Sequence, residues 1–240
     1  MYKTYYDLTD PPFQNTTDQR FLWMGEKHKE ALAAMQYGII ANKGFVLLTG
    51  DIGTGKTTLI NALLQTLEED TLVASLSVSG LDKHGFLRFV SQSFNLPGEW
   101  ERYDEFFFRF EDFLRKAHED DKRVLLIVDE AQKLSEEILE QIRALSNIER
   151  PETKLINIIL VGQEELYQNL QSPSCRALLQ RITVHYRLDR LTEDETIRYI
   201  RHRLKVAGLD RELFDRKAFR LIHRFSRGYP RLINRICDHA

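Results

Sequence analysis

The sequence lacks the features that mark secreted, membrane-spanning and repetitive proteins. Its 240 residues include only two cysteines, Cys175 and Cys237, which are too few for a disulfide framework or a zinc site. No stretch approaches the roughly 18 apolar residues that cross a bilayer, and the first residues lack the apolar run of a signal peptide. With 42% hydrophobic and 29% charged residues, we expect a soluble, cytoplasmic protein with a buried core.

Charge is distributed unevenly, although the net charge is only −2. From Arg176 to Ala240 the chain has 16 Lys and Arg against 8 Asp and Glu, whereas the preceding residues have 18 against 28. A basic C-terminal quarter is a weak indication of an anionic partner. Solvated helix faces and a few phosphate-facing arginines would produce the same pattern, so the charge alone does not choose between them.

Strand and helix patterns alternate in the first part of the chain. Expected strands are 45–49, 72–78, 124–128, 155–161 and 182–188, and expected helices are 56–68, 81–94, 99–119, 135–148 and 164–170. Strands that are apolar throughout are typical of a parallel sheet covered on both faces. Alternation with helices indicates parallel pairing through right-handed crossovers. We therefore expect an α/β domain at residues 1–188, with a five-stranded parallel sheet flanked by helices.

Only helices are expected after Asp189. Thr192 is a candidate cap for a helix over 193–206, Asp215 is one for a helix over 216–225, and Pro230 is a typical first residue of another helix. These signals predict a small helical domain at residues 189–240.

A glycine-rich segment gives the strongest functional signal. Gly50-Asp51-Ile52-Gly53-Thr54-Gly55-Lys56-Thr57 fits the phosphate-loop pattern G-x-x-x-x-G-K-[ST], between an expected strand and an expected helix. The glycines allow backbone N–H groups to turn toward phosphate oxygens, and the helix adds its positive N-terminal end. Lys56 is expected to bridge the β- and γ-phosphates, and the Thr57 hydroxyl to ligate Mg²⁺. Thr58 completes the expected nucleotide-binding segment.

Polar residues follow two further strands at the same expected edge of the sheet. Asp129 and Glu130 follow the run Val124 to Val128, and Gln163 follows Ile158 to Gly162. Ligands of open α/β sheets bind at this edge. We expect Asp129 to hold Mg²⁺, directly or through water, and Glu130 to activate the attacking water as a general base. Gln163 is expected to orient that water or to touch the γ-phosphate.

Three arginines are candidates to contact the γ-phosphate. Arg181 directly precedes the fifth strand, and Arg176 lies one to two turns earlier. Either could reach the nucleotide of a neighbouring subunit. Arg231 follows Gly228-Tyr229-Pro230 at the start of a helix and could reach the nucleotide from the helical domain.

Together these motifs resemble an AAA+ P-loop ATPase with a helical lid. More narrowly, the chain is similar to the ExeA/GspA group, the general secretion pathway A proteins linked to type II secretion in Gram-negative bacteria. This resemblance rests on segments along nearly the whole chain, namely Tyr5 to Phe13, Arg20 to Leu22, His28 to Leu32, Gly44 to Gly50, Asp129 to Gln132, Leu160 to Gln163 and Gly228 to Asn234.

The resemblance implies roles for matching positions. Lys56 and Thr57 would be Walker A, Asp129 and Glu130 Walker B, Gln163 sensor 1, Arg181 the arginine finger and Arg231 sensor 2, with ATP and Mg²⁺ as ligands. The segment before Phe45 would flank the adenine, with Tyr37 and Ile39 as candidates for that pocket. Because Arg181 would act in trans, an ATP-dependent homo-oligomer is expected.

Several functions are compatible with such a module. The first is an ATPase that assembles or remodels a secretion or envelope-export machine, in the cytoplasm or as the cytoplasmic part of an inner-membrane protein. Secretion members continue past the lid toward a membrane helix, so we expect this chain to be either truncated within the lid or a different member of the group. The alternative is a DNA-binding ATPase of the transposition-helper class, similar to TniB. A nucleotide-gated scaffold without turnover is disfavoured by Glu130. A helicase would need a second α/β domain, for which 240 residues leave no room.

Overall fold

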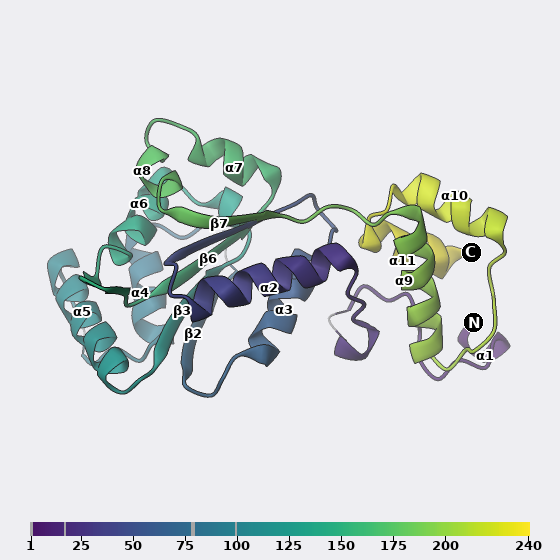
Figure 1. Ribbon diagram of the computed structural model, residues 1–240, viewed down its shortest axis with the longest axis horizontal. Coiled ribbons are helices and arrows are strands. Elements are labelled where there is room, and N and C mark those ends of the chain that lie inside the picture. Colours follow the sequence, from purple (N-terminus) through teal and green to yellow (C-terminus); the bar gives the residue numbers. More distant parts are fainter. Residues whose placement is uncertain (1, 17, 78–79, 99) are drawn as a thin grey trace. The chain divides into compact units, whose positions relative to one another are not determined.

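The computed structural model describes residues 2–16, 18–77, 80–98 and 100–240, and Figure 1 shows the chain as a ribbon. The chain divides into two compact units, each made of segments that are distant in sequence. One unit, which we call the sheet unit, comprises residues 31–50 and 63–187. The other, which we call the lid unit, comprises residues 1–30, 51–62 and 188–240.

The sheet unit contains a five-stranded parallel sheet, as the sequence predicted. Its strands in spatial order are β2 (Thr71–Leu76), β3 (Arg123–Val128), β6 (Asn157–Gly162), β1 (Phe45–Thr49) and β7 (Ile182–Arg187). All neighbouring pairs are parallel. The carboxyl ends of β1, β3 and β6 therefore share one edge of the sheet.

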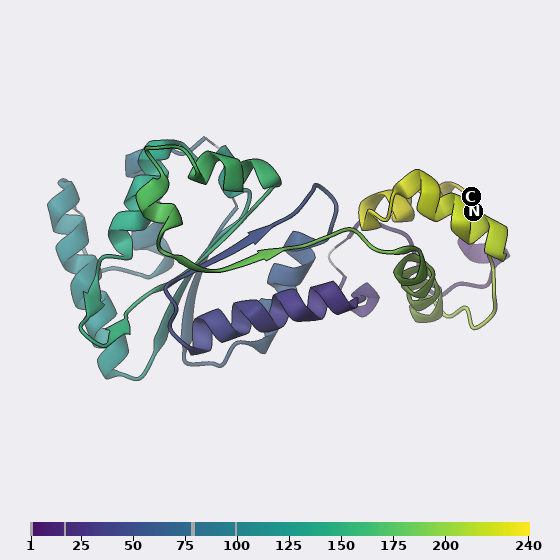
Figure 2. The same ribbon diagram turned by 45° about the horizontal axis from the view of Figure 1, so that its top comes forward.

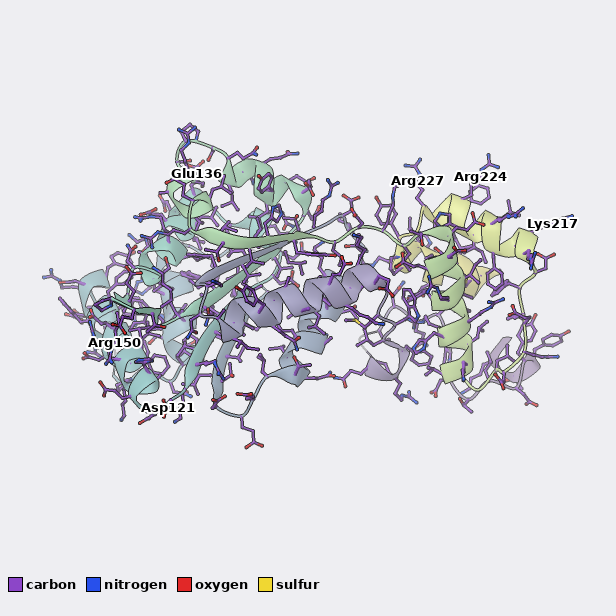
Figure 3. All side chains as sticks on the ribbon, in the orientation of Figure 1. Asp121, Glu136, Arg150, Lys217, Arg224 and Arg227 are labelled. Carbon is purple, nitrogen blue, oxygen red and sulfur yellow. The ribbon has the colours of Figure 1, made fainter. Side chains whose placement is uncertain are left out.

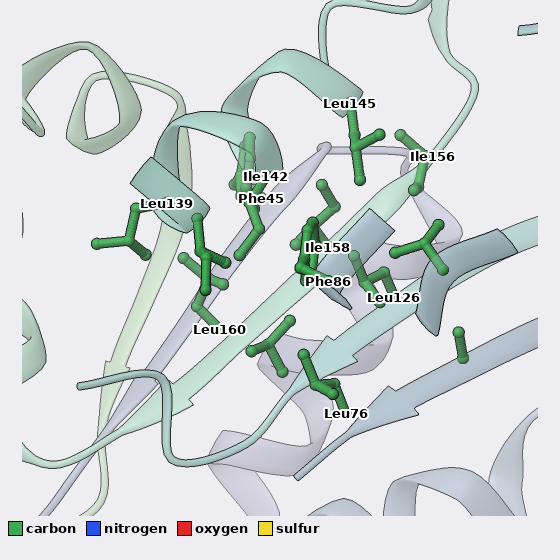
Figure 4. Packing of buried hydrophobic residues seen from close by; sticks show 14 of the residues in the cluster. Phe45, Leu76, Phe86, Leu126, Leu139, Ile142, Leu145, Ile156, Ile158 and Leu160 are labelled. Carbon is green, nitrogen blue, oxygen red and sulfur yellow. The ribbon is translucent and has the colours of Figure 1, made fainter. Parts of the chain in front are cut away.

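Helices cover both faces of this sheet (Figures 1 and 2). On one face lie α4 (Lys83–Ser93), α5 (Tyr103–Glu119) and α6 (Glu136–Leu145), whose apolar residues join the strands in one core. Figure 4 shows Phe86 of α4 and Ile142 of α6 packed on Phe45, Leu126 and Ile158 of the strands. All five side chains are almost wholly buried, so they supply the hydrophobic free energy that holds these layers together.

The opposite face is covered by α2 (Glu26–Ile40). A glycine makes this contact close, because a Cβ atom added at Gly38 would lie 2.3 Å from Cγ2 of Val46. The remaining elements between the strands are α3 (Lys56–Thr66), η2 (Ala131–Lys133), α7 (Glu164–Leu170) and α8 (Arg176–Leu179).

Some expected boundaries differ from those in the structure. The fourth strand begins at Asn157 rather than Leu155, because a two-stranded hairpin of β4 (Glu149–Arg150) and β5 (Thr153–Lys154) precedes it. The helix expected over 99–119 begins at Tyr103, and the helix expected over 135–148 ends at Leu145. Val78 and Glu99, expected at a strand end and a helix start, lie outside the described residues.

The lid unit has a core of its own. Its C-terminal part consists of α9 (Glu193–Val206), α10 (Arg216–Ser226) and α11 (Pro230–His239), each beginning at the residue that the sequence predicted. Thr192 forms a capping box with Glu195, and the Asp215 carboxylate accepts a hydrogen bond from the Ala218 backbone N–H. Within the described parts of the chain, no helix is long and apolar enough to cross a membrane.

The N-terminal segment completes the core of the lid unit. It includes α1 (Tyr2–Tyr5) and the short helix η1 (Gln19–Phe21). Leu8, Phe13 and Phe21 are buried in one cluster with residues of α9, α10 and α11. The buried guanidinium of Arg203 on α9 donates hydrogen bonds to the carbonyl oxygens of Pro12 and Gln14. The N-terminal segment is therefore an integral layer of the helical domain.

Candidate functional site

The glycine-rich loop joins the end of β1 to the start of α3. Gly53 and Gly55 have φ angles of +81° and +104°, which residues with a side chain rarely adopt. The loop turns around the carbonyl oxygen of Asp51, which accepts hydrogen bonds from Lys56 Nζ at 3.0 Å and Thr54 Oγ1 at 2.9 Å. Lys56 is 7% exposed, so its ammonium group is held inside the curl of the loop. This backbone shape suits a cradle for phosphate oxygens.

Residues near the start of α11 hold the loop from the lid side, within the lid unit. The hydroxyl of Tyr229 donates a 2.6 Å hydrogen bond to the Asp51 carboxylate, and this bond raises the pKa of Tyr229. The backbone N–H of Arg231 donates to the carbonyl oxygen of Gly53 at 3.4 Å. The structure thus brings Arg231 to the loop. The hydrogen bond between Tyr229 and Asp51 was not predicted.

His28, on the first turn of α2, contacts the loop from the N-terminal segment. Its imidazole is 5% exposed, and Nε2 lies 3.1 Å from the carbonyl oxygen of Thr54. Since a carbonyl oxygen only accepts, Nε2 carries the proton in this contact. Nδ1 is buried and has no hydrogen-bond partner among the described residues. Burial lowers the pKa of His28, because a second proton would place a positive charge in the interior, and the hydrogen bond to Thr54 and the nearby Glu195 carboxylate offset this only in part.

This contact predicts an acid-sensitive loop. A histidine whose pKa is lowered in the folded state contributes its full stability above the ordinary value of 6.5 and loses it as the pH falls below that value. We expect His28→Gln, which keeps an N–H donor and cannot titrate, to lessen the fall in unfolding free energy between about pH 7.5 and about pH 5.5. Burial lowers the pKa of His185 and His202 as well, so part of the fall remains. Denaturant unfolding at both pH values measures this, and an unchanged fall would contradict the role given to His28.

The acidic pair lies at the end of β3 in the sheet unit. Asp129 is 6% exposed, and its backbone N–H donates to the carbonyl oxygen of Leu76 at the end of β2. Its Oδ1 accepts the backbone N–H of Glu130 at 2.8 Å. Glu130 has a φ of +56°, a left-handed conformation that is unusual for a residue with a side chain. The two adjacent carboxylates thus have different partners, since Asp129 accepts a backbone N–H and Glu130 accepts the side chain of Gln132.

Gln132 connects Glu130 with the end of β6. Its Nε2 donates to Glu130 Oε2 at 2.9 Å, and its Oε1 accepts the backbone N–H of Gln163 at 3.1 Å. Lys133 Nζ lies 3.0 Å from the same Glu130 oxygen. The structure therefore brings Glu130 and Gln163 together through a residue to which the sequence analysis gave no role. The glutamine follows the acidic pair by two positions, which was the only signal in the sequence.

The two candidate trans-acting arginines lie away from this edge. β7 begins at Ile182 beside Phe45, the first residue of β1, so Arg181 is at the edge where these strands start. Its Nη1 donates to Ser146 Oγ at 2.8 Å. Arg176, the first residue of α8, is exposed. Within the sheet unit, neither arginine is near the acidic pair.

Tyr37 and Ile39 also lie at the end of the sheet where β1 starts. They belong to the last turn of α2, and only four residues separate this helix from β1. Tyr37 is 56% exposed with Lys43 over its ring, and Ile39 is buried. The α2 residue that contacts the phosphate loop is His28, at the opposite end of the helix. The placement of these two residues therefore does not favour the adenine pocket proposed for them.

Comparison with known proteins identifies relatives of this architecture. Residues 40–170 match the AAA domain family. The chain is 42% identical over 241 residues to a General secretion pathway protein A from Aeromonas hydrophila. That alignment covers 100% of this chain and 44% of the relative, so the chain spans less than half of that protein's length.

Two solved structures show the same fold at low sequence identity. Cdc6p from Pyrobaculum aerophilum superposes with a TM-score of 0.66 and 20% identity, over 92% of this chain and 64% of that one. The ORC2 protein of Aeropyrum pernix, in ADPNP-ADP complexes, gives a TM-score of 0.61 and 14% identity, over 90% and 64% of the two chains. At these identities the likeness is one of fold.

Proposed function

The chain belongs to the AAA domain family, and we propose that it is an ATP-hydrolysing enzyme whose Mg²⁺-dependent ATP hydrolysis drives assembly or remodelling of a secretion machine. The observation that carries the hydrolytic part is the arrangement of polar groups where β1, β3 and β6 end, with the phosphate loop following β1. The secretion part is supported by the identity with General secretion pathway protein A, and type II secretion or a related envelope-export machine is the setting that we propose.

The residues present fit a nucleoside triphosphate with Mg²⁺. The loop from Gly50 to Thr58 has the left-handed glycines and the buried lysine that a phosphate cradle needs. The Thr57 hydroxyl and the Asp129 carboxylate are oxygen donors, the class of ligand that Mg²⁺ takes. When bound, Mg²⁺ would offset the negative charge of the phosphate oxygens. We assign nucleotide binding to the α/β part of residues 1–188 and the lid to residues 189–240, with the N-terminal segment packed into the core of the lid rather than into the α/β part as the sequence boundary implied.

The chain's own residues then take separate roles in hydrolysis. Glu130 accepts a proton from the attacking water as the general base. Gln132 fixes the orientation of that carboxylate and is also hydrogen-bonded to the backbone N–H of Gln163. The side chain of Gln163 orients the water. Lys56 and Arg231 stabilise the charge that develops on the γ-phosphate, one from the loop and the other from the lid.

Arg181 completes the site of a second copy in this proposal. Its position where β1 and β7 start, in the same sheet as Glu130, is the reason to place its action in trans. The active form would then be an ATP-dependent homo-oligomer with a nucleotide near each subunit boundary. We place it in the cytoplasm, either free or as the cytoplasmic part of an inner-membrane protein.

Mixing two inactive variants tests this function and the trans site together. Arg181→Ala keeps its own Glu130 but offers no arginine to a neighbour, whereas Glu130→Gln has the reverse defect. We expect each variant alone to lose more than about tenfold in ATPase rate, and an equimolar mixture to recover part of it because some sites combine both intact residues. Phosphate release against protein concentration is the measurement.

Two results would count against the proposal. A mixture that is no faster than the mean of its components would contradict the action in trans. A wild-type chain that releases no phosphate from ATP and Mg²⁺ at any concentration would contradict the hydrolytic function itself.

A further inference from the structure

The C-terminal helices contain an unusual run of positive charge. Between Asp215 and Asp238 the chain has seven Lys and Arg and no Asp or Glu. Only Arg231 of these seven has a role in the proposed ATPase site. The remaining charge therefore needs another explanation, and its placement on α10 supplies one.

One side of α10 faces the core of the lid unit and the other faces solvent. Phe219, Ile222 and Ser226 are buried. At about 100° per residue, the opposite side spans an arc of about 140°. This side, which we call the α10 face, consists of Lys217, Arg220, Leu221, Arg224 and Phe225, all exposed. Figure 3 shows Lys217 and Arg224 projecting outward from the helix.

The α10 face combines cations with exposed apolar side chains. Phe225 is 70% exposed and Leu221 is 50% exposed, and they lie one turn apart. Arg220 makes a loose, exposed ion pair with Glu193 at 3.6 Å. Among the residues that the structure describes, neither Lys217 nor Arg224 is paired with a carboxylate. Two large apolar side chains are thus exposed to water beside two cations, Lys217 and Arg224, that have no carboxylate partner in the described part of the chain, a combination that marks interaction surfaces.

We propose that the α10 face docks on an anionic membrane surface. Lys and Arg side chains attract acidic lipid headgroups, and the leucine and phenylalanine between them can enter the boundary between headgroups and acyl chains. The long basic side chains can keep their charges at headgroup level while the apolar pair is buried. A nucleic acid would use the cations and could stack on Phe225, but it gives an aliphatic group such as Leu221 no comparable partner.

A neighbouring groove shares only Arg224 with this docking surface. It has a volume of about 760 Å³, lies within the lid unit, and is lined by Arg224 and by further arginines, Arg190, Arg198 and Arg227. Its walls also hold the carboxylates of Glu26, Asp189, Asp194 and Glu195. With both signs of charge present, the groove has no preference for an anionic headgroup, whereas the α10 face has only cations.

Vesicle flotation with the whole chain tests the proposal. The probes are vesicles of phosphatidylcholine alone and vesicles in which a third of that lipid is replaced by phosphatidylglycerol. We expect binding to the anionic vesicles only, and weaker binding as salt is raised. The double variant Leu221→Ser with Phe225→Ser should bind on the order of tenfold less. Reversing two charges, Lys217→Glu with Arg224→Glu, should have a similar effect.

The chain offers matched controls for both variants. Phe108 on α5 is 68% exposed, so Phe108→Ser removes an equally exposed ring and should leave binding unchanged. The pair Arg88→Glu with Lys122→Glu reverses two exposed charges in the sheet unit. Far-ultraviolet circular dichroism checks that each variant is folded, and Leu221→Ala gives a milder change if the double variant is not.

Three results would overturn the proposal. The first is a wild-type chain that leaves anionic vesicles unbound. The second is binding that the apolar variant retains in full, since this would make the contact purely electrostatic. The third is a chain that does not bind vesicles but retains duplex DNA in a gel, where this retention is lost on charge reversal and unaffected by Phe225→Ser. That pattern would assign the basic face to nucleic acid.

Discussion

Replacing Glu130 with glutamine is expected to lower the rate of ATP hydrolysis on the order of a thousandfold, while ATP still binds. The substitution keeps the size and shape of the side chain and removes its ability to accept a proton. Gln132 can still reach an oxygen at this position, because a glutamine side chain retains one acceptor. The phosphate loop is untouched. The measurement is single-turnover phosphate release, with ATP affinity determined separately by equilibrium titration.

A nearby substitution controls for the loss of one negative charge. Glu137, exposed in the first turn of α6, can be changed to glutamine with no effect expected on phosphate release. A second variant, Gln132→Ala, keeps the base and loses its positioning, so a smaller fall in rate is expected. If Glu130→Gln released phosphate as fast as the wild-type chain, another group would have to be the general base.

Alanine at Gly228 is expected to destabilise the lid unit by more than about 3 kcal/mol. Gly228 has a φ of +81°, and a Cβ atom added there would lie 2.0 Å from the carbonyl oxygen of Leu191. Its own carbonyl oxygen accepts the backbone N–H of Leu191 at 2.9 Å. The added methyl group would separate two backbone segments that the lid holds together immediately before α9 and α11.

Two tryptophans allow each unit to be followed separately. Trp23 packs edge-on against Tyr199 in the lid unit, with ring centroids 6.1 Å apart, whereas Trp100 belongs to the sheet unit. In a Trp100→Phe background, denaturant unfolding followed by fluorescence reports on the lid unit.

The control is Gly80→Ala in the sheet unit, where φ is +91° and no atom lies within 4 Å of the added Cβ, and its unfolding is followed through Trp100 in a Trp23→Phe background. It isolates the conformational cost, about 1–2 kcal/mol. If both substitutions lowered the unfolding free energy by the same amount, the close contact with Leu191 would make no contribution to the effect at Gly228.

The fold was predictable where the sequence carries its own local signal. The run Phe45 to Leu48 is apolar at every position, and the strand from Phe45 to Thr49 is buried at every position, as expected for a central parallel strand. Thr192 and Asp215 marked helix starts correctly, because a capping side chain accepts a hydrogen bond from a backbone N–H only three residues further along the chain. α2 was missed, since its first turn has no capping residue to announce it.

The sequence predicted which residues form the candidate site better than it predicted the contacts between them. Spacing identified the loop and the acidic pair, because both motifs are contiguous in sequence. The hydrogen bonds of Gln132 and Tyr229 depend on contacts that tertiary packing creates, 31 and 178 residues apart respectively. The position of Arg181 at the far edge follows from the register between β1 and β7, which no local pattern reveals.

The joining of the N-terminal segment to the lid has a consequence for how the chain folds during synthesis. Thr9 is hydrogen-bonded to Ala207, 198 residues away, and Asn15 to Asn234, 219 residues away. The first segment to leave the ribosome must therefore wait for the α11 region before it can be buried, whereas residues 31–187 already contain every strand of the sheet. Contacts of such long sequence separation form slowly. We expect chaperones to bind the nascent chain at the exposed apolar side chains of Leu8, Phe13 and Phe21.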